Sequence, residues 1–259
     1  LEPCSHKGKT PPCVGAIIKR KIKKVVIANL DKNPKVNGSG IVKLKNAGIQ
    51  VITGICEAYA DEINYPFFKF ITENKPYITL KLGTSIDGKI ALSNGKSHFV
   101  TGDLARRFCF MLRAKNDAII VGSNTYQLDN PQLNCRIKGL EENSPQKIVL
   151  GKVKNLRKGF LNYTTHNLKN IFDDLAKKGF YRIMVEGGGK LAASLLKENL
   201  VDEIYFIKSG KIFGGDATNS IGNLALNEIP CAQFKIKKTI QLGDDLIINF
   251  KKAAQGLFH

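Results

Sequence analysis

The spacing of apolar residues alternates along the chain between a period typical of strands and one typical of helices. Residues 77–82 alternate and are rich in β-prone side chains, which predicts a strand. Over 103–114 the apolar residues return every three or four positions, which predicts a helix. The short apolar run 118–121 ends at Gly122, as a buried strand does. Strand, helix and strand in succession predict an α/β fold, with polar residues presented where the strands end.

The same criteria divide the rest of the chain. After the run 118–121 they predict a polar turn that ends in Asp129-Asn130-Pro131, and at 253–259 a loose tail. Asn74-Lys75-Pro76 interrupts the helical pattern and predicts a boundary between domains 1–74 and 75–259. Further strands are predicted over 24–30, 49–53, 148–150, 182–185, 203–207, 234–242 and 245–250, and further helices over 41–47, 58–73, 168–178 and 191–198.

Composition narrows the possible functions. The net charge of +18 would suit nucleic-acid binding, but no basic tail, zinc-finger repeat or RNA-binding motif accompanies it, so no nucleic-acid partner is expected. No apolar run approaches the length of a membrane span, so no membrane partner is expected. Six cysteines without a secretion-signal pattern predict reduced thiols and a cytoplasmic protein. Leu1 in place of an initiator Met suggests that the natural N-terminus lies upstream.

The stretch from Pro76 to Arg136 carries four motifs in order: L-K-L-G-T-S-I-D-G-K, G-K-S-H-F-V-T, L-R-A-K-N-D-A-I-I-V-G and T-Y-Q-L-D-N-P-Q-L-N-C-R. Each alone is a weak signal, but together they resemble the reductase half of the bifunctional riboflavin-biosynthesis deaminase/reductase family. The resemblance extends over nearly the whole chain. It implies a dihydrofolate-reductase-like domain with a mostly parallel sheet over 75–259, preceded by the back half of a cytidine-deaminase-like α/β domain over 1–74.

The resemblance also implies an activity in riboflavin biosynthesis. Enzymes of this family use NADPH to reduce the ribose of 5-amino-6-(5-phosphoribosylamino)uracil to its ribityl form. Their other half uses zinc to deaminate 2,5-diamino-6-ribosylamino-pyrimidinone 5′-phosphate. The expected partner is therefore a phosphorylated pyrimidine, and the expected assembly is a homo-oligomer, either a dimer or a tetramer. The competing hypotheses are a zinc hydrolase and a basic nucleic-acid-binding module.

Charged residues within the motifs are candidates for chemistry. Arg113 and Arg136 are the candidates for the substrate phosphate, because a guanidinium group can donate two hydrogen bonds to one phosphate. Arg113 also ends a predicted helix, where a cation stabilises the helix dipole. Lys81, Asp129 and Glu186 are the catalytic candidates, for handling a proton or for binding ribose hydroxyls. The substrate contacts that the resemblance implies are Ser97, Arg113, Leu133, Arg136 and Glu186.

A glycine-rich loop, 186–190, lies between a predicted strand and a predicted helix. Free amides and the helix dipole at such a junction favour a phosphate group. Lys152 could pair with the 2′-phosphate of NADPH, and a surface lysine without that role fits equally well. Phe99 stands where the family usually has Trp and keeps an aromatic wall. The cofactor contacts that the resemblance implies are Gly83, Phe99, Thr125, Asp129, Lys152, Gly188, Gly189, Lys190, Leu191, Ala192, Ala193 and Ser194.

Cys4 and Cys13 resemble the second half of a zinc deaminase site, in which His and two Cys hold a metal that activates water. The eight residues between them match the longer insert of the riboflavin-pathway deaminase. In the family the third ligand and the catalytic glutamate belong to a His-Ala-Glu segment, which these 259 residues do not contain. The deaminase site is therefore expected to be incomplete in this chain. The cofactor expected for the chain is NADPH, which serves the reductase domain.

Overall fold

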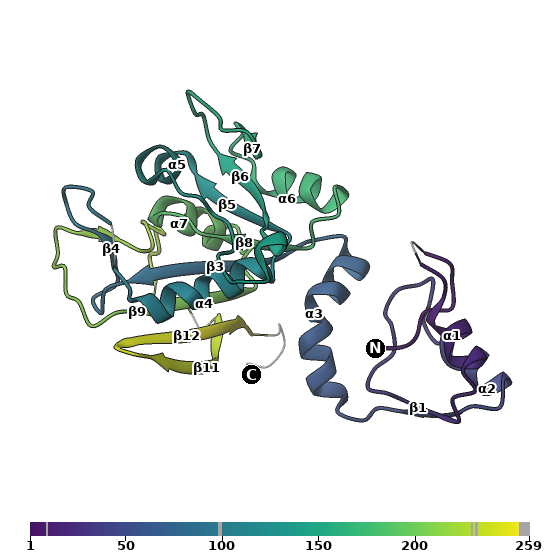
Figure 1. The fold of residues 1–259 in the computed structure, drawn as a ribbon. Helices are drawn as coiled ribbons and strands as arrows, with labels where there is room; N and C mark the ends of the chain where they lie inside the picture. The colour runs from purple at the N-terminus through teal and green to yellow at the C-terminus, as the bar shows by residue number, and fades with distance from the viewer. Residues whose placement is uncertain (9, 98–99, 229, 231–232, 254–259) are drawn as a thin grey trace. The chain divides into compact units, whose positions relative to one another are not determined.

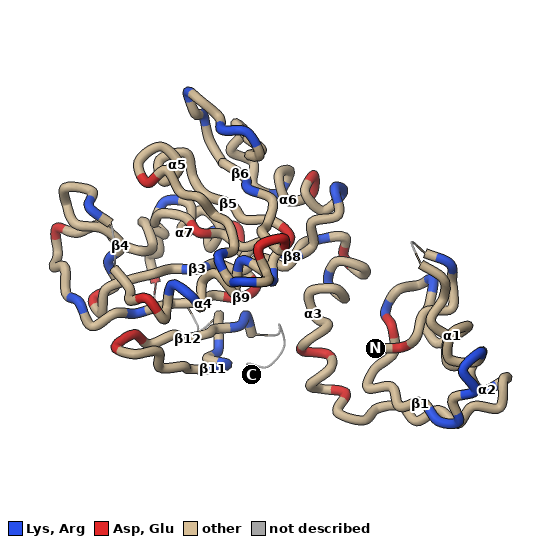
Figure 2. Tube along the Cα trace, viewed as in Figure 1, with Lys and Arg blue, Asp and Glu red and all other residues tan. Residues whose placement is uncertain are grey.

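The computed structural model describes residues 1–8, 10–97, 100–228, 230 and 233–253 of the chain. It forms two compact units, Leu1–Lys75 and Pro76–His259, each of which is described by itself. No helix in the described ranges is both long and apolar enough to cross a bilayer. Figure 2 shows Lys and Arg distributed over most elements, with Asp and Glu among them. The predicted lack of a nucleic-acid partner stays a prediction.

The first unit is a small α/β structure. Its β1 and β2 form a parallel pair, and Val14, Leu44 and Ile49 form its buried apolar cluster. The predicted strands and helices of this unit are confirmed within a few residues, while α1 was not predicted. Its elements are α1 (Cys13–Lys19), β1 (Lys24–Ile27), α2 (Ser39–Asn46), β2 (Gln50–Thr53) and α3 (Glu57–Glu73).

Glu2 ties the N-terminal segment to the rest of the first unit. Its side chain is 4% exposed, and its carboxylate accepts hydrogen bonds from the amides of Gly38 and Gly40, each at 2.9 Å. The amides of Asp31 and Ile41 approach the same carboxylate at 3.3 Å. Because an anion at the start of a helix is stabilised by the free amides there, Glu2 anchors its segment on the N-terminus of α2.

The second unit is built on an eight-stranded sheet with the order β11-β12-β9-β3-β8-β5-β6-β7 (Figure 1). The six strands from β9 to β7 run parallel, and the hairpin of β11 and β12 adds an antiparallel edge. The predicted mostly parallel α/β sheet is confirmed. The elements are β3 (Tyr77–Thr84), β4 (Lys89–Ala91), α4 (Asp103–Ala114), β5 (Ala118–Gly122), α5 (Ser123–Asp129), η1 (Glu141–Asn143), β6 (Gln146–Leu150), β7 (Phe160–Tyr163), α6 (Leu168–Lys177), β8 (Arg182–Val185), α7 (Gly189–Lys197), β9 (Glu203–Lys208), β10 (Thr218–Asn219), β11 (Phe234–Leu242) and β12 (Asp245–Lys252).

Side-chain alternation along the strands divides the core between the two faces of this sheet. Ala118 and Ile120 of β5 pack with α6 and α7 in the largest buried cluster. Their neighbours Ile119 and Val121 pack with Tyr126 of α5 on the opposite face. Helix α4 packs against β9 and β12 in a third cluster. Both faces are thus covered by helices, as a parallel sheet requires.

Four differences from the sequence-based prediction concern short elements. The predicted polar turn before Pro131 is a helix, α5, which ends at Asn130 in the left-handed conformation. Strand β7 and the small antiparallel pair of β4 and β10 were not predicted. The helix predicted from Leu191 begins at Gly189, because the glycine loop itself enters the first turn. The predicted tail is described only to Ala253; the rest of it lies outside the described residues.

Candidate active site

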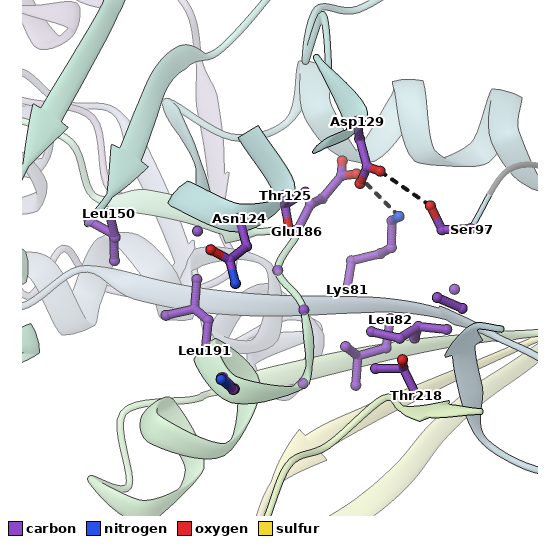
Figure 3. Close-up of a pocket in the computed structure, with 18 of the residues that line it drawn as sticks. Lys81, Leu82, Ser97, Asn124, Thr125, Asp129, Leu150, Glu186, Leu191 and Thr218 are labelled. Atoms are coloured by element: carbon purple, nitrogen blue, oxygen red, sulfur yellow. Dashed lines mark hydrogen bonds and ion pairs between the residues drawn. The ribbon is translucent and has the colours of Figure 1, made fainter. Parts of the chain in front are cut away.

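A cavity of about 1050 Å³ lies at the carboxyl ends of the parallel strands of the second unit (Figure 3). It is lined by Lys81 and Gly83 of β3, by Gly122 at the end of β5, by Leu150 at the end of β6 and by Glu186 directly after β8. Ligands of open α/β sheets bind at this edge, because the loops that follow the strands converge there. The volume is ample for a dinucleotide together with a small substrate.

The cavity contains a three-membered charged cluster centred on Glu186. Lys81 Nζ lies 3.1 Å from Glu186 Oε2. Arg113 donates from Nε to Oε1 at 2.8 Å and from Nη2 to Oε2 at 3.0 Å. The three side chains are only 16%, 11% and 13% exposed for Lys81, Glu186 and Arg113, so little solvent screens the charges.

The protonation states of this cluster follow from the pairing. Burial alone would raise the pKa of Glu186, but the charges of Lys81 and Arg113 outweigh burial and lower it to about 2. Burial alone would lower the pKa of Lys81, but Glu186 outweighs it and holds that pKa above the usual value. At neutral pH Glu186 is therefore a carboxylate and Lys81 an ammonium. Of the two, Lys81 is the group with a proton to donate.

Arg113 has a position that the sequence did not predict. Besides its fork onto Glu186, its Nη1 donates to the carbonyl oxygen of Asn134 at 3.2 Å. All three nitrogens of the guanidinium group are thus engaged with the protein. Arg113 thus fixes the orientation of the Glu186 carboxylate. The predicted contact of Arg113 with the substrate phosphate stays a prediction.

A second polar pair, Ser97 and Asp129, lines the same cavity. Ser97 Oγ donates to Asp129 Oδ1 at 3.2 Å, which joins the loop after β4 to the end of α5 (Figure 3). Thr125 of α5 also lines the cavity. Predicted substrate and cofactor contacts therefore meet in the same space.

The glycine loop approaches the cavity with its backbone. Gly188 is the N-cap of α7 with φ −73° and ψ 170°, so it has an ordinary extended conformation. A Cβ atom at Gly188 would meet only Thr125 Oγ1, at 3.9 Å, whereas a Cβ at Gly189 would lie 2.5 Å from the carbonyl oxygen of Asn219. Gly189 is thus required by the protein's own packing, and Gly188 leaves open space toward the cavity. The first amides of α7 have no acceptor within the helix, which suits an anion.

The predicted site residues differ in how they meet the cavity. Leu133 has φ +56° and is 1% exposed; its side chain packs in a buried cluster, and it is not among the residues that line the cavity. Arg136 is exposed and lies over Phe110, which does line the cavity, with 5.6 Å from Cζ to the ring centroid. Lys152 is exposed and follows Gly151, which lines the cavity. Phe99 lies outside the described residues. Ala192 and Ala193 are on the buried face of α7 and are not among the residues that line the cavity. Those that line the cavity are Lys81, Gly83, Ser97, Arg113, Thr125, Asp129, Glu186, Gly188, Gly189, Lys190, Leu191 and Ser194.

Two cavity-lining segments were missed. Thr165 and His166 follow β7, and Thr218 and Asn219 form β10. Strands β7, with four residues, and β10, with two, are too short to show a period, so neither segment had a local signal. Gly189 is the link to the second segment, since its carbonyl oxygen accepts a hydrogen bond from the amide of Gly222 at 2.8 Å.

The two candidate zinc ligands lie close together in the first unit. The amide of Cys13 donates to Cys4 Sγ at 3.3 Å, and the pKa of Cys13 is raised by its hydrogen bond to Cys4 and by the Cys4 charge. In the part of the chain that the structure describes, no cluster of three or more His, Cys, Asp or Glu side chains is placed to hold a metal. These residues supply half of a tetrahedral site, so no step of a reaction is derived through zinc.

The fold and the cavity define an α/β enzyme of the dihydrofolate-reductase-like class. Residues 76–248 match the family model described as RibD C-terminal domain. The chain is 38% identical to the riboflavin biosynthesis protein RibD of Aquifex aeolicus, over 97% of this chain and 79% of that protein. It is 32% identical to the protein of the same name from Escherichia coli, over 96% of this chain and 80% of that protein. The chain therefore belongs to the RibD family.

Solved structures agree with this assignment. RibD of Acinetobacter baumannii superimposes with a TM-score of 0.88 at 32% identity, over 98% of this chain and 80% of that one. A diaminohydroxyphosphoribosylaminopyrimidine deaminase/5-amino-6-(5-phosphoribosylamino)uracil reductase of Thermotoga maritima gives 0.84 at 29% identity, over 98% and 78%. The resemblance inferred from the four motifs is confirmed, and the protein is an enzyme of riboflavin biosynthesis. A nucleotide cofactor belongs to the reductase reaction of this family.

Proposed function

We propose that the second unit uses NADPH to reduce the ribose of 5-amino-6-(5-phosphoribosylamino)uracil to the ribityl form. The observation that carries the proposal is the Lys81–Glu186–Arg113 cluster in the same cavity as the glycine loop of α7. The cluster contains the Lys81 ammonium, which can donate a proton. The glycine loop contributes backbone amides that can bind a pyrophosphate. The Thermotoga maritima relative, which is named for both a deaminase and this reductase, supports the choice of substrate.

The residues present fit a dinucleotide cofactor. Open space at Gly188, the first amides of α7 and the adjacent Lys190 together form a cradle for phosphate. When bound, NADPH supplies a hydride to C1 of the ribose, which is opened as a Schiff base. The protein's contribution is then orientation and electrostatics.

We assign to Lys81 the donation of the proton that the reduction requires. As C1 of a Schiff base is reduced, its nitrogen gains a bond to hydrogen, and the ammonium of Lys81, which Glu186 fixes in the cavity, is placed to donate that proton. Glu186 holds Lys81 in place, and Arg113 holds Glu186. Asp129 was predicted as a cofactor contact, but because it accepts a hydrogen bond from Ser97, a predicted substrate contact, we assign both to the substrate side. Arg136 is assigned as the cation for the substrate phosphate.

The same proposal covers assembly and compartment. We infer a homo-oligomer, as a dimer or tetramer, and a cytoplasmic enzyme, since the five cysteines in the described ranges are free thiols. The zinc-dependent deaminase reaction is not assigned to these residues, because Cys4 and Cys13 lack a described third ligand.

The test is consumption of NADPH by the purified chain, followed by absorbance, with the phosphoribosylamino substrate. The ribityl product identified by mass should appear in equal amount to the NADP⁺ formed. Omission of the substrate is the background control, and the dephosphorylated substrate tests the phosphate contact. Absence of NADPH consumption by a folded chain that binds NADPH would contradict the proposal.

A further inference from the structure

Arg157 lies in the connection between β6 and β7 and joins it to the segment after α5. Its Nη2 donates to the carbonyl oxygen of Pro131 at 2.7 Å. Its backbone amide donates to the hydroxyl oxygen of Tyr126 at 2.8 Å, and its Nε lies 3.4 Å from the same oxygen. That hydroxyl donates to the carbonyl oxygen of Asn155 at 3.1 Å. One arginine thus ties together the connection, helix α5 and the chain beyond it.

Two aromatic rings contact the guanidinium group of this arginine. Its Cζ lies 4.9 Å from the ring centroid of Tyr126 and 4.6 Å from that of Phe160. The two rings contact each other edge to face, with centroids 5.2 Å apart. A half-buried guanidinium group that contacts two adjoining rings and a carbonyl oxygen has few alternative rotamers, so its hydrogen bond to Pro131 has a defined direction.

The segment 129–136 needs such support. Leu133 has φ +56°, a left-handed conformation that is unfavourable for a branched side chain. Its side chain is 1% exposed and packs with Tyr126 and Val149. A strained residue persists only where its surroundings determine its conformation. Arg157, which binds the carbonyl group two residues earlier, is one of those determinants.

The ends of the same segment carry residues that we assign to the site. Asp129 lines the cavity and accepts the hydrogen bond of Ser97. Arg136 lies over Phe110, another cavity-lining residue. Pro131 lies between the two, so the position of its carbonyl group affects the direction of both.

We propose that Arg157 is a positioning residue of the reductase, which holds the segment 129–136 so that Asp129 and Arg136 face the substrate. Arg157 itself does not line the cavity in the described residues. The proposal rests on the proposed function, since it assigns Arg157 to the placement of that substrate. It predicts an effect on substrate binding that is separate from cofactor binding.

The test compares Arg157→Ala and Arg157→Lys with Lys158→Ala, which removes one exposed cation from the same connection. A lost hydrogen bond to a charged group should raise the substrate KM of Arg157→Ala by roughly tenfold or more, with NADPH affinity within about twofold of wild type. Arg157→Lys keeps the charge but lacks the planar guanidinium group, so its substrate KM should rise as in Arg157→Ala. Lys158→Ala should resemble wild type.

A double-mutant cycle with Arg136→Ala separates positioning from simple stabilisation. If Arg157 directs Arg136, the rise in KM caused by Arg136→Ala should be smaller in the Arg157→Ala background. A lower melting temperature with unchanged KM, or fully additive KM changes, would overturn the positioning role while leaving the proposed function intact. A wild-type chain that never consumes NADPH with the substrate would overturn both.

Discussion

Arg113 and Glu186 form a two-pronged ion pair, with Nε to Oε1 at 2.8 Å and Nη2 to Oε2 at 3.0 Å. Lys81 contacts the same carboxylate, so one anion is held between two cations. The three side chains together carry one net positive charge, and Glu186 keeps Lys81 protonated. An ammonium fixed beside a carboxylate is suited to hold a proton at one defined place.

Removal of Arg113 should leave Glu186 poorly placed and less stabilised. Breaking a buried ion pair by deleting one partner costs about 3–5 kcal/mol, and the exposure of this pair suggests the lower end. We expect Arg113→Ala to lower the free energy of unfolding in urea and to reduce kcat. The control is Arg107→Ala, an exposed arginine of the same helix. Equal stabilities for the two variants would show that the pair contributes nothing measurable.

The loss of unfolding free energy at acidic pH should depend on Glu186. Its pKa in the folded protein, about 2, lies below its ordinary value, so its contribution is present above that ordinary value and is lost as pH falls toward 2. Between pH 5 and 2 wild type should therefore lose more unfolding free energy than Glu186→Gln, which has no such proton to take up. Denaturant titrations at several pH values measure this. Parallel curves for the two proteins would contradict the depressed pKa.

Gly188 and its neighbour Gly189 should respond differently to an added side chain. Gly188→Val would place branched carbons in the open space beside Thr125, so NADPH binding should weaken roughly tenfold or more while the fold survives. Because the φ of Gly188 is ordinary, backbone strain plays no part. Gly189→Ala should instead destabilise the protein by about 1–3 kcal/mol, through the clash with Asn219. Cofactor fluorescence titration and melting curves give both values, and unchanged NADPH binding in Gly188→Val would remove the loop from the cofactor site.

A substitution at Lys152 should show whether this residue contributes to a preference for NADPH over NADH. The residue is exposed and follows the cavity-lining Gly151, which places it near an end of the cavity. If it pairs with the 2′-phosphate, Lys152→Ala should weaken NADPH by up to about fivefold, leave NADH unchanged, and lose its effect at high salt. Lys154→Ala, another exposed lysine in this connection, is the matched control. An equal loss for both cofactors would assign Lys152 to the surface.

Much of the fold could be predicted because its elements are locally periodic. The predicted helix 103–114 agrees with α4, and the predicted strand 182–185 agrees with β8. Helix α5 was missed because its seven residues, S-N-T-Y-Q-L-D, are mostly polar and contain turn-forming types. Strand β10 has two residues, which cannot show a period.

The site was predicted as residues but not as contacts. Lys81 and Glu186 were identified as candidate charged groups for proton handling, and the structure brings them to 3.1 Å from each other. The pairing of Arg113 with Glu186 spans 73 positions, and only the parallel order of β3, β8 and β5 brings the two near each other. Arg157 carried no signal at all, because its role depends on two rings and a carbonyl group that meet only in the folded chain.

In the proposed reaction Lys81, held by Glu186, supplies the proton for reduction of the substrate. The most direct measurement is single-turnover consumption of enzyme-bound NADPH by wild type and Lys81→Gln, at saturating substrate. Loss of a general acid should slow this step by about 10²–10⁴-fold, with the Kd for NADPH nearly unchanged; because Lys81→Gln also removes one cation from Glu186, the melting temperature should fall but stay above the assay temperature. A single-turnover rate equal to that of wild type would contradict the assignment.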